Sequence, residues 1–147
     1  MTTSPIGVAL GEIGVTESPK NSNKTKYGKW FGMDGCAWCG IFVSWCYAQA
    51  GKPLPNIGFS KGFAGCQTAV AYFKKNKKIT TQPKEGDIVF FDWNSDGRYD
   101  HTGLFVKWID SNQFETIEGN TSLTNDSNGG QVMKRIRNKK TAIFVCI

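Results

Sequence analysis

The amino-acid sequence predicts an α+β fold, with helices packed on a mainly antiparallel β-sheet. In the first half of the chain, apolar residues recur at helical spacing. In the second half, short runs rich in β-branched and aromatic residues alternate with turn clusters, and helices followed by strands are typical of α+β domains. The 147 residues contain no Gly/Ser/Pro-rich linker, so we expect a single domain over residues 1–147. The expected strands are residues 88–91, 102–108, 113–117, 131–136 and 141–146.

Three helices are expected. Ser4 is a suitable N-cap with Pro5 at the first helical position, and one apolar face follows, made of Ile6, Ala9, Leu10 and Ile13. A second helix is predicted over residues 38–50 with a buried face of Phe42, Val43, Cys46, Tyr47 and Ala50, and a third over residues 65–75 with Ala69, Val70 and Phe73 inward. Residues 15–35 are rich in Gly, Asn, Ser and Lys, which predicts a long surface loop carrying Tyr27, Trp30 and Phe31.

Composition excludes several classes of protein. The net charge of +6 suggests anionic partners, such as nucleic acid, anionic membranes or anionic cell-wall polymers, and does not choose among them. The lysines follow no nucleic-acid motif, so we expect no nucleic-acid partner. The sequence contains no apolar run of about 18 residues, so we expect no membrane-spanning helix. Residues 1–5 lack the basic and apolar regions of a Sec-type signal, so action outside the cell would require another route of release.

His101 is the only histidine and lies where a polar loop meets a predicted strand. We expect its side chain to be held rigidly there and to face outward. If the strands over residues 102–108 and 113–117 form a hairpin, Glu118 and Asn120 return toward His101. An acidic or amide side chain at that point can accept the imidazole N–H and fix its tautomer. The three residues therefore form a candidate acid–base site.

Cys39 is the best-placed candidate nucleophile, because it lies at the predicted start of the helix over residues 38–50. The unpaired N–H groups and the positive end of the dipole at a helix N-terminus favour thiolate over thiol, and a nearby imidazolium favours it further. The alternative is a buried structural thiol, a description that fits Cys46, Cys66 and Cys146.

Cys36 and Cys39 form a C-x-x-C pair, which permits a redox motif or half of a zinc site. No second C-x-x-C or histidine pair completes four zinc ligands, and no βαβ pattern surrounds the pair.

The loop before His101 matches the start of an EF-hand-type calcium loop. Oxygen ligands for Ca²⁺ would come from Asp92, Asn94, Asp96, the Arg98 carbonyl and Asp100, with Gly97 permitting the turn. Gly103 stands where the pattern needs a bidentate carboxylate, so the motif is incomplete, and the alternative is a polar turn of acidic residues. Since Asp100 adjoins His101, a metal that orders the loop would also order the histidine.

Four segments in this order resemble a CHAP domain (cysteine, histidine-dependent amidohydrolase/peptidase), a family that includes many bacteriophage endolysins. They are residues 37–46 (AWCGIFVSWC), 86–91 (GDIVFF), 100–103 (DHTG) and 117–121 (IEGNT). The resemblance implies a papain-like α+β fold. It assigns Cys39 as nucleophile, His101 as general base, Glu118 as the carboxylate that orients the histidine, and Asn120 as an accompanying polar residue. Members with an acidic loop before the histidine bind calcium there.

The family implies a peptidoglycan hydrolase that cleaves an amide bond, as an endopeptidase or an N-acetylmuramoyl-L-alanine amidase. We expect a monomeric phage lysin, made in the host cytoplasm and released to act on the cell wall. Two alternatives remain at this point: a non-enzymatic, calcium-dependent wall-binding module, and a redox protein that uses Cys36 and Cys39.

Overall fold

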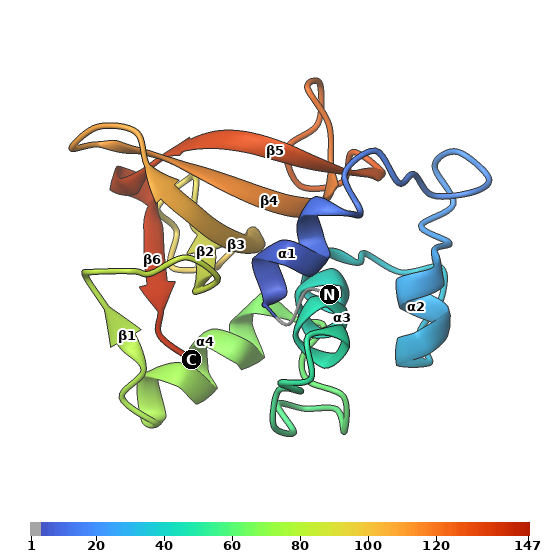
Figure 1. The fold of residues 1–147 in the computed structure, drawn as a ribbon, viewed down its shortest axis with the longest axis horizontal. Coiled ribbons are helices and arrows are strands. Elements are labelled where there is room, and N and C mark those ends of the chain that lie inside the picture. Colours follow the sequence, from blue (N-terminus) through green and yellow to red (C-terminus); the bar gives the residue numbers. More distant parts are fainter. Residues whose placement is uncertain (1–3) are drawn as a thin grey trace.

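A six-stranded antiparallel sheet forms the centre of the computed structural model, which describes residues 4–147 (Figure 1). The strand order is β1-β6-β2-β3-β4-β5. The strands are β1 (Ile79–Thr80), β2 (Ile88–Phe91), β3 (His101–Trp108), β4 (Gln113–Thr121), β5 (Gln131–Asn138) and β6 (Ala142–Val145). The α+β prediction is confirmed. Residues 1–3, which belong to the segment compared above with a signal peptide, lie outside the described residues.

The helices are α1 (Pro5–Leu10), α2 (Lys26–Phe31), α3 (Cys39–Gln49) and α4 (Cys66–Lys75). Figure 1 shows α1, α3 and α4 grouped on one side of the sheet, with α2 beside α3. The helices predicted near residues 38–50 and 65–75 are confirmed within a residue at each end, and the residues expected to face the core are buried in both. Gly51, at φ 77°, follows the C-cap Ala50, as a helix end requires.

The first helix begins as predicted but ends earlier. The Ser4 side chain accepts a hydrogen bond from the Gly7 N–H, and Pro5 occupies the first turn. Because α1 ends at Leu10, only the first turns of the expected apolar face reach the core. Ile6 and Ala9 are buried, whereas Leu10 and Ile13 are exposed, contrary to the expectation.

The prediction of a surface loop over residues 15–35 was wrong in its second half. Thr25 caps α2 by accepting a hydrogen bond from the Gly28 N–H, and Gly32 ends the helix in the left-handed conformation. Tyr27 is fully buried, with its ring 5.0 Å from Phe42 on α3 and 4.9 Å from Trp45. Such a short helix is stabilised by tertiary packing rather than by its own propensity, which explains why the local composition concealed it.

The predicted hairpin is confirmed, because β3 and β4 pair antiparallel with Leu104 opposite Ile117. However, β4 extends to Thr121, beyond the expected end at residue 117, so Glu118 and Asn120 lie within the strand. The strand expected over 131–136 likewise extends to Asn138, and the short edge strand β1 was not predicted. The longer β4 carries its polar residues across the sheet to His101.

Apolar side chains cover both faces of the sheet. The larger core lies between the sheet and the helices and includes Ile41, Phe42, Phe90, Leu104 and Ile117. A smaller cluster lies on the opposite face and consists of Val89, Phe91, Phe105, Phe114 and Phe144. Since Phe91 is the direct register partner of His101, the two side chains share this second face.

Candidate active site

Cys39 is the first residue of α3 and is 7% exposed. Its N-cap, Trp38, provides no side-chain hydrogen bond to the first turn, so no N-cap side chain satisfies the free backbone N–H groups there. These N–H groups and the helix dipole create a positive potential where the sulfur lies. The start of the predicted helix therefore has the electrostatics expected for a reactive thiol.

Close packing holds this helix start against the sheet. The Trp38 indole is fully buried, and its Nε1 donates to Glu17 Oε2 at 3.2 Å. Behind it, a Cβ at Gly119 on β4 would lie 2.7 Å from the Cβ of Phe42, so glycine is required there. Gly40 is required too, because a Cβ would lie 2.6 Å from the Ala64 carbonyl oxygen. The backbone around Cys39 thus has little freedom to move.

His101 is the first residue of β3 and is completely buried, contrary to the expectation that it faces outward. The cause is aromatic packing. Its ring stacks on Trp93, with centroids 5.6 Å apart, and on Phe91, at 6.2 Å. The Nε2 atom lies 2.9 Å from Glu118 Oε1. The imidazole is therefore held in one orientation by two rings and one carboxylate.

The second ring nitrogen of His101 is available to Cys39. Nδ1 is buried and has no hydrogen bond of ordinary geometry among the described residues. Burial opposes a charge on the ring, but the interactions with Cys39 and Glu118 outweigh it and raise the pKa of His101 to about 9. The structure therefore favours an imidazolium that faces the thiol.

The pKa of Cys39 is held well below its usual value. The largest cause is a hydrogen bond from the Cys66 thiol, burial acts in the opposite direction, and His101 and the Gly40 N–H lower the pKa further. A lowered thiol pKa and a raised imidazole pKa together favour a thiolate–imidazolium pair near neutral pH.

Cys66 is a part of this site that the sequence interpretation missed, since it described this residue as a structural thiol. Cys66 is the first residue of α4, just as Cys39 is the first residue of α3, so both helices begin with a cysteine. Its hydrogen bond to Cys39 and its burial raise its pKa well above the usual value. Cys66 therefore remains a protonated thiol. The signal in the sequence was a cysteine near the start of two of the three predicted helices.

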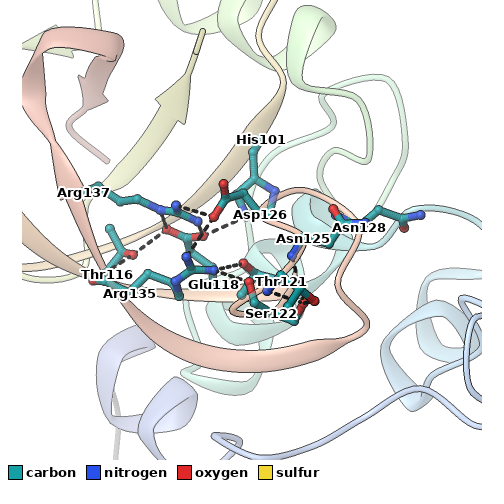
Figure 2. A network of polar contacts seen from close by, with 11 residues as sticks. His101, Thr116, Glu118, Thr121, Ser122, Asn125, Asp126, Asn128, Arg135 and Arg137 are labelled. Carbon is teal, nitrogen blue, oxygen red and sulfur yellow. Dashed lines mark hydrogen bonds and ion pairs between the residues drawn. The ribbon is translucent and has the colours of Figure 1, made fainter.

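Glu118, on β4, is fully buried and accepts hydrogen bonds from several directions (Figure 2). Besides His101, Thr116 Oγ1 lies 2.5 Å from Oε2. Arg137 on β5 donates from Nε to Oε2 at 2.8 Å and from Nη2 to Oε1 at 2.6 Å. Burial raises the pKa of Glu118, but the hydrogen bonds from Arg137 and His101 outweigh it and lower the pKa to about 2. The carboxylate is therefore charged at physiological pH.

Asn120 lies next to the site but has no hydrogen bond to His101. Its Oδ1 accepts from the Gly130 N–H at 3.0 Å, and its Nδ2 donates to Asn128 Oδ1 at 3.1 Å. Its backbone has a φ of 58°, in the left-handed region. The Asn120 side chain is fully buried and thus holds the loop over residues 122–130 rather than the imidazole.

The acidic loop before His101 forms a turn that its own carboxylates stabilise. Asp92 accepts hydrogen bonds from the N–H groups of Asp96 and Gly97, at 3.2 and 2.9 Å, and Gly97 has a φ of 83°. A hydrogen bond from the Arg98 N–H lowers the pKa of Asp96, and the Asn94 side chain lowers it further by a smaller amount. The side-chain oxygens of Asp92, Asn94 and Asp96 therefore lie on one turn, and their chemistry fits a calcium ion.

Asp100, in contrast, directs its carboxylate to the loop backbone and accepts from the Trp93 N–H at 2.9 Å. Within residues 4–147, no three acidic, cysteine or histidine side chains are grouped as a metal site. Of the predicted calcium ligands, Asp100 thus already has a backbone partner in this conformation.

The remaining cysteines take different positions. The Cys36 thiol donates to the Met33 carbonyl oxygen at 3.0 Å, and burial raises its pKa. Cys36 and Cys39 are both free thiols, so the C-x-x-C pair is not closed. Cys46 is buried as expected, but Cys146 is exposed, because it follows the end of β6. Nothing in these contacts favours the redox interpretation.

No helix within the described part of the chain is both long and apolar enough to cross a membrane. Comparison with curated proteins found no match. The family model described as "CHAP domain" matches residues 30–120, which is more than half of the chain and includes Cys39, His101 and Glu118. It is a family of peptidoglycan hydrolases, generally cysteine- and histidine-dependent amidohydrolases. With its fold and this match together, the chain belongs to the CHAP domain family.

Proposed function

We propose that this protein hydrolyses an amide bond of bacterial peptidoglycan, with Cys39 as nucleophile, His101 as general acid and base, and Glu118 as the carboxylate that orients the histidine. The observation that supports this assignment is the buried row of Cys39, His101 and Glu118, in which the neighbouring groups favour thiolate, imidazolium and carboxylate. This is the charge pattern that cysteine hydrolases use.

The reaction follows from these charges. The Cys39 thiolate attacks the amide carbonyl carbon and forms a tetrahedral oxyanion. As the C–N bond breaks, the His101 imidazolium gives its proton to the leaving amine, which leaves a thioester and a neutral imidazole. His101 then takes a proton from water, and the hydroxide attacks the thioester carbonyl. Cleavage of the C–S bond releases the carboxylic acid and restores the thiolate–imidazolium pair.

The start of α3 supplies a donor for the oxyanion. The Cys39 backbone N–H lies in the first turn of the helix and has no intrahelical partner. In enzymes of this type the loss of one such donor raises the barrier by roughly 3–4 kcal/mol. The same helix end therefore serves both the nucleophile and the intermediate.

The proposal extends to the biological setting. A monomer that acts as one domain over residues 1–147 and carries a net charge of +6 suits a wall that bears anionic polymers. We propose a phage lysin that is made in the host cytoplasm and then released to the wall, a role supported by the many endolysins in the family.

Digestion of purified cell walls tests the proposed reaction. The protein is expected to clear a wall suspension, and mass spectrometry of the soluble products identifies the bond. New amino groups from peptide bridges would identify an endopeptidase, whereas free muramyl lactyl groups would identify an amidase. Binding to sedimented walls without any product would contradict the hydrolase and favour a wall-binding module.

We further propose that the loop before His101 binds Ca²⁺ through Asp92, Asn94, Asp96, the Arg98 carbonyl and Asp100, whose Oδ1 is not used by the hydrogen bond from the Trp93 N–H. Binding to the native state alone raises the free energy of unfolding, by about 2.7 kcal/mol at 100 times the Kd. We expect the melting temperature of chelator-treated protein to rise when CaCl₂ is added, and wall clearing to rise with it.

Asp96→Ala should remove this response. Asp110→Ala is the matched control, because Asp110 also accepts backbone N–H bonds in an exposed turn, at 2.8 Å from Asn112 and Gln113, but lies at the far end of the β3–β4 hairpin. An unchanged melting temperature with CaCl₂, or an equal loss in both variants, would rule out this loop as the metal site.

A further inference from the structure

Arg137 lies on β5, outside the segment that the CHAP family model matches. Its side chain is only 8% exposed and lies on the sheet face that carries His101 and Glu118. A buried arginine must find partners for its charge and its donors, and Arg137 does so at Glu118 and at one residue of the loop over 122–130, Asp126. Figure 2 shows the guanidinium between these two carboxylates.

The contacts fix the guanidinium on every side. It donates to both oxygens of Glu118, at 2.8 and 2.6 Å, and from Nη1 to Asp126 Oδ1 at 2.9 Å. Its Cζ lies over the rings of Phe91 and Trp93, 5.5 and 4.9 Å from their centroids. The same Trp93 ring stacks on His101. One aromatic wall therefore orients both the arginine and the histidine.

We propose that Arg137 is a positioning residue of the wall-hydrolysing reaction, which keeps the Glu118 carboxylate ionised and turned so that its Oε1 accepts from His101. This inference rests on the proposed function. Arg137 itself does not reach the reacting atoms; it acts through Glu118.

The charges along the site alternate in sign. From the nucleophile outward they are Cys39, His101, Glu118, Arg137 and Asp126, of which only Asp126 is largely exposed, at 52%. The groups that face Glu118 are His101 from β3, Thr116 from β4 and Arg137 from β5, with Asp126 beyond the arginine. Without Arg137, the fully buried carboxylate would keep the Thr116 hydroxyl but would have His101 as its only charged partner, and burial would favour its protonation.

A protonated Glu118 cannot stabilise the imidazolium. It would also have only one free acceptor oxygen and would be free to rotate toward Thr116. Since Arg137 occupies both oxygens, it removes that freedom and leaves Oε1 directed at Nε2 of His101. The arginine therefore extends the range of low pH over which the site keeps its charge pattern.

Arg135 offers a matched control on the same strand. It also binds Asp126, at 2.8 Å, and it donates to Thr121 Oγ1 at 2.8 Å and to the Ser122 carbonyl at 2.6 Å. It has no hydrogen bond to Glu118. Replacing Arg135 thus disturbs the same loop and also removes one positive charge, but it leaves every hydrogen bond of Glu118 in place.

The experiment compares wild type, Arg137→Met and Arg135→Met by their kcat/KM for wall hydrolysis as a function of pH. For Arg137→Met we expect kcat/KM to fall at least tenfold at neutral pH. We also expect the acid limb of the profile, where kcat/KM declines toward low pH, to move to higher pH by at least one unit. Arg135→Met should leave the acid limb where it is in the wild type. Arg137→Lys keeps the charge but cannot bind both oxygens of Glu118 in the same way, so the acid limb of its profile should lie between those of wild type and Arg137→Met. This variant replaces Arg137→Met in the experiment if the methionine variant does not fold.

A second readout does not depend on activity. The ¹³C carboxyl resonance of Glu118, identified by its loss in Glu118→Gln, should stay unchanged down to about pH 4 in the wild type and titrate above pH 4 in the Arg137 variants. The inference would be overturned if both Arg137 variants kept the wild-type titration of Glu118 and the wild-type acid limb. It would also be overturned if Arg135→Met shifted both by as much as the Arg137 variants do. If wild type hydrolyses no wall, the proposed function fails while the resonance still decides whether Arg137 controls Glu118.

Discussion

Cys39→Ala is expected to reduce wall hydrolysis by at least about 10³-fold, because no other side chain at the site can form the thioester. Cys66 is also a cysteine at this site. Its interaction with Cys39 is lost in this variant, but burial still raises its pKa, so it remains a thiol. The fold should persist, because the substitution removes one sulfur from a helix start that Trp38 and Gly40 hold by packing.

Turbidity loss of purified walls measures the rate, and sedimentation with walls measures binding. Binding is expected to remain while clearing stops. The control is Cys36→Ser, three residues earlier, whose thiol donates to the Met33 carbonyl and should be dispensable. Clearing at the wild-type rate by Cys39→Ala would refute the assignment of the nucleophile, and loss of activity in Cys36→Ser would restore the redox interpretation.

The elements that carry Cys39 and His101 were predictable from local sequence. The apolar spacing after Trp38 and the stop at Gly51 are local signals, so the start of α3 could be placed within one residue of Cys39. The hairpin of β3 and β4 follows from two runs of strand-forming residues around a turn. A hairpin brings its outer ends together, which is why Glu118 could be placed near His101.

What could not be predicted depends on contacts between distant residues. Tyr27 reads as part of a polar loop, and only the rings of α3 explain its burial. The residues beside Arg137 in β5 are mostly polar, so no local sequence pattern shows that its side chain is buried against Glu118. Cys66 and Cys39 affect each other's pKa although 27 positions separate them, and a local sequence pattern does not show such an interaction.

Glu118→Gln is expected to have the second large effect, at least about 10²-fold on kcat. The amide oxygen can still accept from His101 Nε2, but it carries no charge to support the imidazolium. The pKa of His101, which the interaction with Glu118 helps raise to about 9, should fall, and the thiolate–imidazolium pair should be less populated.

The same substitution should change the dependence of stability on pH. The pKa of Glu118 is lowered to about 2 in the folded protein, from its ordinary value of 4.5. A lowered pKa in the folded state adds stability above pH 4.5, and this stability is lost as the pH falls through 4.5 toward 2. Two and a half pH units correspond to a contribution on the order of 3 kcal/mol at neutral pH.

Urea unfolding of wild type and Glu118→Gln at several pH values measures this contribution. The difference in the free energy of unfolding should be largest near neutral pH and should shrink toward pH 2, where the wild-type carboxylate gains a proton. Glu115→Gln is the control on the same strand, because Glu115 lies 3.8 Å from the half-exposed Lys134 and such pairs contribute at most about 1 kcal/mol. A difference that does not change with pH would mean that the charge of Glu118 does not stabilise the fold, and the alternating row of charges behind Cys39 would lose its physical basis.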